Sequence, residues 1–230
     1  MSNRSDWPAG YFIGERGAKI DTAIIEAFRK LPAANIGDCM GRSNAALGLK
    51  AYHNDPELVL CGPALTVKVR PGDNLMIHKA IELAQPGDVI VIDGSGDLTQ
   101  ALIGGLMRTS AQTKKIAGFV VNGAVRDLNE WAEGGISCWA VGNTLRGPSK
   151  DGPGEVNTTI SCAGMIVAPG DLIVADADGV IVIPQDQLDT VLPRVQQHAQ
   201  REEKIRASNQ SGTADPERFN SILRAKGCPL

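Results

Sequence analysis

Apolar runs and helical patterns alternate along most of the chain, and this alternation constrains the fold more than any other feature. Four runs are expected to form strands: residues 64–69, 89–92, 117–121 and 138–141. Helices are expected between them: residues 74–84, 98–113 and 127–133. Strands that alternate with helices predict a fold of the α/β class with a parallel or mixed sheet.

The two ends of the chain have other patterns. Residues 20–31 carry an apolar helical stripe with Asp21 near its start, and a short helical piece is expected from about Asn35 to Met40. Several short strands separated by glycine turns are expected over residues 157–183, which favours an added antiparallel layer. Two helices are expected after them, over residues 188–206 and 216–226.

The tripeptide Pro-Gly-Asp occurs three times: at residues 71–73, 86–88 and 169–171. Proline fixes φ at the first central position of a turn, and glycine accepts a positive φ at the second, so each tripeptide predicts a type II turn. Two of the turns lead directly into strands. This recurrence is compatible with an internal duplication and equally with a turn device used twice.

Composition excludes several classes of protein. The 230 residues carry a formal net charge of −3 with no block of Lys or Arg, which argues against nucleic acid as the main partner. No segment approaches the ~20 apolar residues of a membrane span, and the first residues lack the apolar core of a signal peptide, so we expect a cytoplasmic protein without a membrane partner. The five scattered cysteines indicate reduced thiols rather than a disulfide framework.

The most informative stretch is GFVVNGAVRDLNEW, residues 118–131. A strand is expected to end at Asn122-Gly123, and Arg126 and Asp127 follow, in the crevice beyond the strand ends where α/β proteins bind ligands. An arginine can hold a carboxylate through two parallel hydrogen bonds, and an aspartate can give one oxygen to Mg²⁺. The three histidines share no metal-ligand spacing, so a metal here should take oxygen ligands. A 2-oxo acid offers the matching carboxylate and ketone.

The same residues have simpler interpretations, which the sequence leaves open. Asp127 and Glu130 match a capping box at the start of a helix, with Arg126 as a surface residue, and for Glu130 alone the cap is the favoured interpretation. The pair Gly104-Gly105 could expose backbone N–H groups to an anion, although close helix packing is favoured from these residues alone. His78, inside a helical pattern, is interpreted as a packed or surface histidine.

A longer set of motifs resembles a known family. Gly105, twenty residues, and then Arg126-Asp127-x-x-Glu130 match the signature of the class II 4-hydroxy-4-methyl-2-oxoglutarate/4-carboxy-4-hydroxy-2-oxoadipate aldolases and the related RraA-like regulators of RNase E activity. The likeness covers roughly residues 33–185 and includes these motifs: GPALTV (62–67), GDN (72–74), PGDVIV (86–91), PGEVN (153–157) and PGDLIVADADGVIVIP (169–184).

The resemblance implies a compact α/β/β sandwich with a mixed sheet, related to swivelling phosphohistidine domains. It divides the chain into an N-terminal arm and helix (1–32), an RraA-like aldolase core (33–185) and a C-terminal helical extension (186–230). It also implies a homotrimer or homohexamer. An acidic residue from a neighbouring subunit would complete the site, and Glu202 or Glu203 is the candidate.

For the site, the resemblance implies that Asp127 binds a divalent cation, Mg²⁺ or alternatively Mn²⁺, and that Arg126 and Asp127 are catalytic. Arg126 would also bind the substrate. The other substrate-binding residues that it implies are Gly104, Gly105, Leu106, Met107 and Lys150.

The activity implied is metal-dependent cleavage of 4-hydroxy-2-oxo acids, such as 4-hydroxy-4-methyl-2-oxoglutarate, to pyruvate and a second oxo acid, with oxaloacetate decarboxylation as a side activity. Two alternatives stay open. One is a non-enzymatic regulator that binds a ribonuclease, and the other is a different metal-dependent lyase of 2-oxo acids.

The expected C-terminal helix has an apolar stripe of Leu188, Val191, Leu192 and Val195 on an otherwise polar surface. A stripe of this kind packs on another element. We expect that element to belong to a partner chain, so that the site lies between subunits. The alternative is that the helix folds back on its own sheet.

Overall fold

The computed structural model describes residues 3–230, and its centre is one mixed sheet. Seven strands follow one another across this sheet in the order β1 (Tyr11–Ile13), β8 (Gly154–Val156), β3 (Leu60–Val69), β4 (Val89–Asp93), β6 (Gly118–Val125), β7 (Ser137–Asn143) and β2 (Lys50–Ala51). The four central strands, β3, β4, β6 and β7, are parallel. Strands β8 and β2 join them antiparallel, so the expected α/β fold with a mixed sheet is confirmed.

A second β layer covers one face of this sheet. Strands β11 (Leu172–Asp176) and β12 (Gly179–Ile183) form an antiparallel pair, and β11 also pairs antiparallel with residues 60–63, the first half of β3. Strands β9 (Ile160–Cys162) and β10 (Met165–Val167) form a separate antiparallel pair. The expected run of short strands over residues 157–183 therefore forms, and β3 belongs to both layers.

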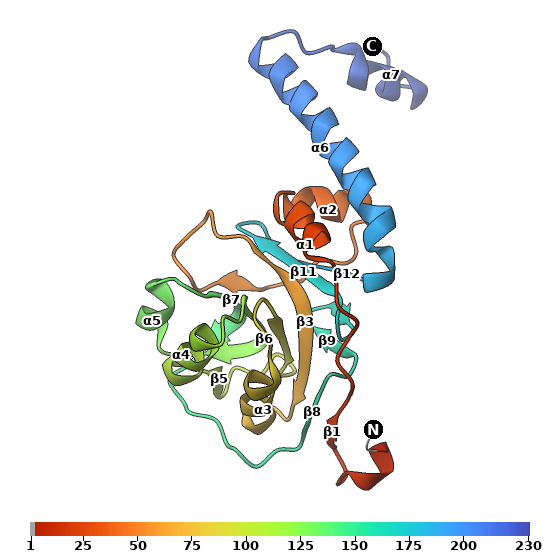
Figure 1. Ribbon diagram of the computed structural model, residues 1–230. Helices are drawn as coiled ribbons and strands as arrows, with labels where there is room; N and C mark the ends of the chain where they lie inside the picture. Colours follow the sequence, from red (N-terminus) through yellow and green to blue (C-terminus); the bar gives the residue numbers. More distant parts are fainter. Residues whose placement is uncertain (1–2) are drawn as a thin grey trace.

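Helices cover the two outer faces of this sandwich (Figure 1). On the open face of the main sheet lie α3 (Leu75–Leu83), α4 (Gly105–Thr113) and α5 (Leu128–Ala132). Beyond β11 and β12 lie α1 (Thr22–Arg29), α2 (Ala33–Cys39) and α6 (Leu188–Gln210). Helix α7 (Glu217–Ala225) follows α6 at the end of the chain, and single 3₁₀ turns form at Arg4–Asp6 and Gln185–Gln187.

Three apolar clusters lie between these layers, and the strands divide their side chains among them with the two-residue period of a strand. Ile90 and Ile92 face the helices on the open side, whereas Val89 and Val91 face the second β layer. In β11, Ile173 faces the main sheet, and its neighbours contact α1, α2 and α6. Strands buried on both faces explain the continuous apolar runs.

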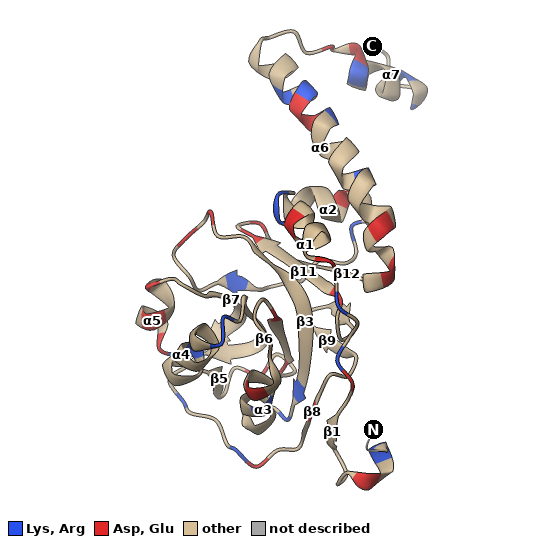
Figure 2. Cartoon of the chain, viewed as in Figure 1, with Lys and Arg blue, Asp and Glu red and all other residues tan. Residues whose placement is uncertain are grey.

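Charged residues of both signs are interspersed over loops and helices, with several on α6 (Figure 2). Within the described chain, no helix is long and apolar enough to cross a membrane.

All three Pro-Gly-Asp tripeptides form the expected turns. The glycines have positive φ: +72° at Gly72, +87° at Gly87 and +89° at Gly170. In each turn the aspartate N–H donates to the carbonyl three residues earlier, over 3.0, 3.1 and 3.2 Å. The helix expected near Asp21 also begins as predicted, because the Asp21 carboxylate accepts a hydrogen bond from the Ala23 N–H (2.9 Å) and caps α1.

Two expected boundaries are wrong, and both lie near the candidate site. Residues 98–113 are not one helix, because Ala101–Ile103 form strand β5 and α4 starts only at Gly105. The strand expected to end at Asn122-Gly123 continues to Val125. In each case pairing with a neighbouring strand prevails over the local pattern, since β5 pairs parallel with the last residues of β6.

The expectation that the C-terminal stripe covers a partner chain is also wrong. Leu188, Val191 and Val195 are buried in this chain's own third cluster, among residues such as Phe28 and Ile36. Helix α6 therefore folds back on its own subunit, where α1, α2 and the β11–β12 pair provide the apolar surface that its stripe requires.

Candidate active site

The candidate site forms where two parallel strands end side by side. Strands β5 and β6 pair parallel, with Ile103 opposite Val125, so their carboxyl ends lie at the same edge of the sheet. Gly104 and Gly105 follow β5 directly, and Arg126 follows β6. The Arg126 N–H donates to the Ile103 carbonyl (3.0 Å), which holds the two strand ends together.

Asp127 has a left-handed backbone, with φ of 59° and ψ of 48°. A non-glycine residue adopts this conformation at a cost, and such strain is commonly found at functional positions. Its Oδ2 accepts a hydrogen bond from the Gly105 N–H (2.7 Å) and lies 3.6 Å from the Arg126 Nε. Its other oxygen, Oδ1, has no hydrogen-bond partner between residues 3 and 230. The side chain thus has one anchored oxygen and one open oxygen.

The capping-box interpretation of this stretch is wrong. Asp127 precedes α5, but its carboxylate makes no hydrogen bond to that helix, and in the described chain Glu130 accepts none from the Asp127 N–H. An N-cap residue normally has an extended backbone, and the left-handed turn at Asp127 directs its carboxylate toward Gly105 instead.

The glycines at the start of α4 leave space that two carboxylates fill. A Cβ on Gly104 would collide with Oδ2 of Asp127, and a Cβ on Gly105 would collide with the carboxylate of Glu130. The signature residues, which are spread over 26 positions of the sequence, therefore converge on one backbone junction. The Gly104-Gly105 pair therefore lets the backbone approach two carboxylates closely, which is a role beyond helix packing.

A cavity of about 90 Å³ opens beside this junction. It is lined by Asn74, His78, Ala101, Leu102, Gly104, Leu106, Met107, Arg126, Pro148 and Lys150. Five of the seven residues implied for the site are among them. The other two, Gly105 and Asp127, adjoin Gly104 without lining the cavity. Glu202 lies on α6 beside α2, and neither it nor Glu203 lines the cavity of its own chain.

Two polar residues of the cavity were missed from the sequence. Asn74 is buried; its Nδ2 donates to the Leu102 carbonyl (2.9 Å), whereas its Oδ1 has no hydrogen-bond partner in the described chain. A buried unpaired oxygen is costly, and it marks a position for a donor from a ligand or water. His78 lies one turn further along α3, and burial, together with the nearby Lys150 charge, lowers its pKa. The i, i+4 spacing of the two residues was the available signal.

The residues that flank Lys150 bind a buried carboxylate, that of Asp73. Asp73 accepts hydrogen bonds from the Ser149 hydroxyl (2.7 Å) and from the N–H groups of Asp151 (2.7 Å) and Gly152 (3.0 Å). Burial alone would raise the pKa of Asp73, but these hydrogen bonds and one from the Leu75 N–H outweigh it and lower the pKa. The segment that carries Lys150 is thereby fixed to the start of α3.

The residues present fit a divalent cation of the Mg²⁺ type. Such an ion accepts one or two carboxylate oxygens and keeps several waters, so it needs a partly exposed acid with a free oxygen. The Asp127 side chain is 41% exposed and has its Oδ1 open. Glu130, against Gly105, adds a second carboxylate to the same junction.

The junction can also bind an anion. At the start of α4, the Gly105 N–H is taken by Asp127 and the Met107 N–H by the Gly104 carbonyl (3.1 Å), which leaves the Leu106 N–H without an acceptor in the described chain. A free N–H at a helix N-terminus, with Arg126 and Lys150 in the same cavity, suits a small carboxylate.

The chain is therefore an α/β/β sandwich with a polar cavity at paired strand ends, which is the position where ligands commonly bind in α/β proteins. The chain belongs to the RraA-like family, because the family model described as Aldolase/RraA matches residues 33–182. A Halalkalibacterium halodurans protein, by its name a candidate 4-hydroxy-4-methyl-2-oxoglutarate aldolase, is 44% identical over 178 residues, which is 77% of this chain and 83% of the relative.

Two further relatives carry different names. The 4-hydroxy-4-methyl-2-oxoglutarate aldolase of Thermus thermophilus is 39% identical over 113 residues, 49% of this chain and 69% of the relative. The crystal structure of Streptomyces coelicolor RraAS2, described as an unusual member of the RNase ES inhibitor RraA protein family, has a TM-score of 0.76 at 26% identity and covers 83% of this chain and 98% of its own. The family thus includes proteins named as aldolases and proteins named as RNase inhibitors.

Proposed function

We propose that this protein is a divalent-metal-dependent aldolase that cleaves 4-hydroxy-2-oxo acids, of the 4-hydroxy-4-methyl-2-oxoglutarate type, to pyruvate and a second oxo acid. The observation that carries the proposal is the junction of β5 and β6. There a partly exposed carboxylate with an open oxygen lies 3.6 Å from an arginine that lines a small cavity. A protein that acts only by binding another protein has no need of this arrangement.

In this proposal the protein's own groups bind and orient the substrate. The Leu106 N–H and the Lys150 ammonium receive the C1 carboxylate, and Arg126 donates hydrogen bonds to the 2-oxo group. The proton of the 4-hydroxyl passes to water, the C3–C4 bond breaks to release the second oxo acid, and Arg126 stabilises the negative charge that develops on the 2-oxo oxygen. The enolate then takes a proton from water at C3, which gives pyruvate. His78, whose pKa is lowered, is neutral at pH 7 and does not oppose the two cations.

Asp127 would hold the cation, with Glu130 beside it as the second carboxylate. A bound Mg²⁺ or Mn²⁺ supplies Lewis-acid polarisation of the 2-oxo group. Decarboxylation of oxaloacetate also produces the enolate of pyruvate, so it requires the same stabilisation of negative charge. The proposal therefore includes it as a side activity.

The test is an assay of pyruvate release by the purified protein. A panel of 4-hydroxy-2-oxo acids and oxaloacetate is offered with Mg²⁺, with Mn²⁺, and with excess chelator. We expect cleavage that the chelator abolishes and either ion restores. Full activity in the chelator would contradict the role of the cation.

Two other outcomes would point to the alternatives. Activity on oxaloacetate alone would favour another 2-oxo acid lyase. No activity on any substrate, together with inhibition of a ribonuclease, would favour the regulatory role for which the Streptomyces relative is named.

A further inference from the structure

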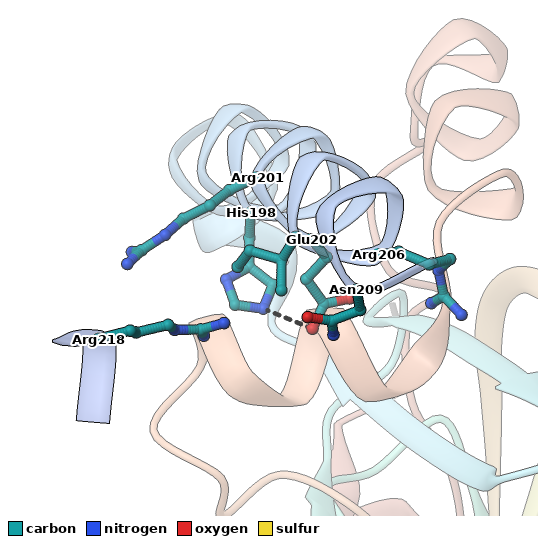
Figure 3. A pocket seen from close by; sticks show the side chains of 7 residues that line it. His198, Arg201, Glu202, Arg206, Asn209 and Arg218 are labelled. Carbon is teal, nitrogen blue, oxygen red and sulfur yellow. Dashed lines mark ion pairs between the residues drawn. The ribbon is translucent and has the colours of Figure 1, made fainter. Parts of the chain in front are cut away.

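A second group of metal-capable side chains lies far from the candidate site, between α2 and α6. Asp38 is on α2, and His198 and Glu202 are one turn apart on α6. The His198 Nε2 lies 3.8 Å from the Asp38 Oδ2 and 3.5 Å from the Glu202 Oε1. Figure 3 shows the His198 and Glu202 side chains pointing toward each other from α6. Among residues 3–230, this is the one group of three such side chains whose ligand atoms all lie within 4.8 Å of one another.

These separations are at or beyond the limit of hydrogen bonds. The His198 Nε2 is buried and has no hydrogen-bond partner in the part of the chain that the structure describes. Ligands about 2.0–2.2 Å from one zinc ion lie roughly 3–4 Å from each other, which is the observed spacing of the imidazole from both carboxylates. The histidine nitrogen and the two carboxylates thus surround a common centre.

The orientation of Asp38 agrees with this arrangement. Its Oδ1 accepts a hydrogen bond from the Arg42 Nε (2.7 Å), which leaves Oδ2 to face His198. Ligating carboxylates are commonly fixed by such an outer hydrogen bond.

We propose that Asp38, His198 and Glu202 bind a divalent transition-metal ion of the zinc type, which fixes α6 to α2. The imidazole ligand favours Zn²⁺ or Co²⁺ over Mg²⁺, which prefers an all-oxygen shell. Water completes the coordination, because a cavity of about 420 Å³ lies beside His198 and Glu202. The site is distinct from the one at Asp127, and its role is structural.

The experiment uses Co²⁺ as the probe, on the full-length protein with Mg²⁺ in excess so that oxygen-only sites are occupied. Co²⁺ binding is followed by calorimetry and by visible absorption. We expect the wild-type protein to bind one Co²⁺ tightly. His198→Gln and Asp38→Asn should each bind it roughly 100-fold more weakly or worse, since even loss of an outer-shell partner costs 10–100-fold. Asp189→Asn, at an exposed carboxylate of the same helix outside the group, should bind it as the wild type does.

A second readout reports the structural role without any assay of activity. Bound Co²⁺ should slow hydrogen exchange of the α6 amides around residues 195–205 in the wild-type protein, and should leave that exchange unchanged in His198→Gln. Because these residues lie outside the candidate active site, the result is independent of the proposed aldolase activity.

Three outcomes would overturn the proposal. The first is a wild-type protein that binds no Co²⁺. The second is equal binding by the wild type and both variants. The third is a sulfur-to-cobalt charge-transfer band, which would assign the ion to one of the free cysteines instead.

Discussion

Gly105 contacts both carboxylates of the junction. Its N–H donates to the Asp127 carboxylate, and its missing side chain leaves room for the Glu130 carboxylate. The fixed spacing of the signature, from Gly105 to Asp127 and Glu130, is therefore explained by contacts within one junction.

Gly105→Ala tests this explanation. The new methyl group must displace the Glu130 carboxylate, which is the free end of a flexible side chain, so we expect the fold to survive while kcat/KM falls on the order of 10²-fold, the cost of a misplacement of about 1 Å. The control is Gly37→Ala inside α2, where the methyl meets only the Ile181 side chain at 3.5 Å. That variant should keep full activity and gain up to about 1 kcal/mol of stability from helix propensity. Equal activity of both variants would show that Glu130 is not needed.

Arg126→Lys distinguishes a substrate-binding arginine from a surface arginine. The ammonium group of lysine cannot reproduce the planar fork of arginine. The stabilisation of the transition state should therefore fall by about 3 kcal/mol, which lowers kcat/KM roughly 100-fold. The melting temperature should be unchanged because the Arg126 side chain is 40% exposed. Arg4→Lys, at an exposed ion pair with Glu155, is the control and should keep full activity. Near wild-type kinetics in Arg126→Lys would make Arg126 a surface residue.

Single residues also show how far the sequence could predict this site. The pairing of Arg126 with Asp127 was visible because the two are adjacent and follow an apolar run. Asn74 and His78 were not, because their role depends on α3 lying over the end of β5, which is a tertiary contact. The capping box at Asp127 failed for a related reason, since the partner that its carboxylate binds, Gly105, lies 22 positions away.

At the scale of elements, β5 was the main error. Its three residues, Ala101–Ile103, are too few to predict a strand next to a helical pattern, and they form one because β6 offers a parallel neighbour. The turns and the long apolar strands could be predicted, because proline, glycine and continuous apolar runs act locally.

The segment that carries Lys150 depends on the buried carboxylate of Asp73. Asp73→Asn should lower the free energy of unfolding at pH 7 by about 2–3 kcal/mol, because several N–H donors and a hydroxyl lose an ionised acceptor. The pKa of Asp73 is lowered in the folded state, so its stabilisation is fully present above its ordinary value near 3.8 and is lost as the pH falls through the lowered pKa. The difference between wild type and variant, measured by urea unfolding, should therefore shrink below that pH.

Asp151→Asn is the matched control. This carboxylate also lies near Arg70, but it is 78% exposed, so its loss should change stability by no more than about 0.5 kcal/mol. A similar loss in both variants would mean that the burial of Asp73 has no special role.

At the scale of the whole molecule, the candidate site lies on a surface with large exposed apolar side chains. Leu106 is 87% exposed, and Leu145 is 89% exposed. The neighbours of Leu145 are hydrogen-bonded to the two strands of the site: Thr144 to Val125 of β6, and Arg146 to Ala101 of β5. Exposed leucines beside a polar cavity are typical of a contact surface. They support assembly around the site, whereas α6, which was expected to provide that contact, is packed on its own chain.

We therefore expect a homotrimer or homohexamer in light scattering. Leu145→Asp should shift the protein toward the monomer and lower its activity, because one wall of the site would be lost. Leu47→Asp, at a leucine that is 77% exposed beside Gly164, should change neither. A fully active monomer would show that each chain contains a complete site.

Strand β3 is shared by two layers, and this has a consequence for cooperativity. Its first half pairs with β11, its second half with β8, and its other edge with β4. Neither layer can open without breaking the hydrogen bonds of this strand, so the amide protons in its middle should exchange with solvent only through global unfolding. The strand ends that carry Arg126 and the helices that surround His198 then belong to one folding unit. A substitution that destabilises one of these two regions should therefore lower the free energy of unfolding of the other as well.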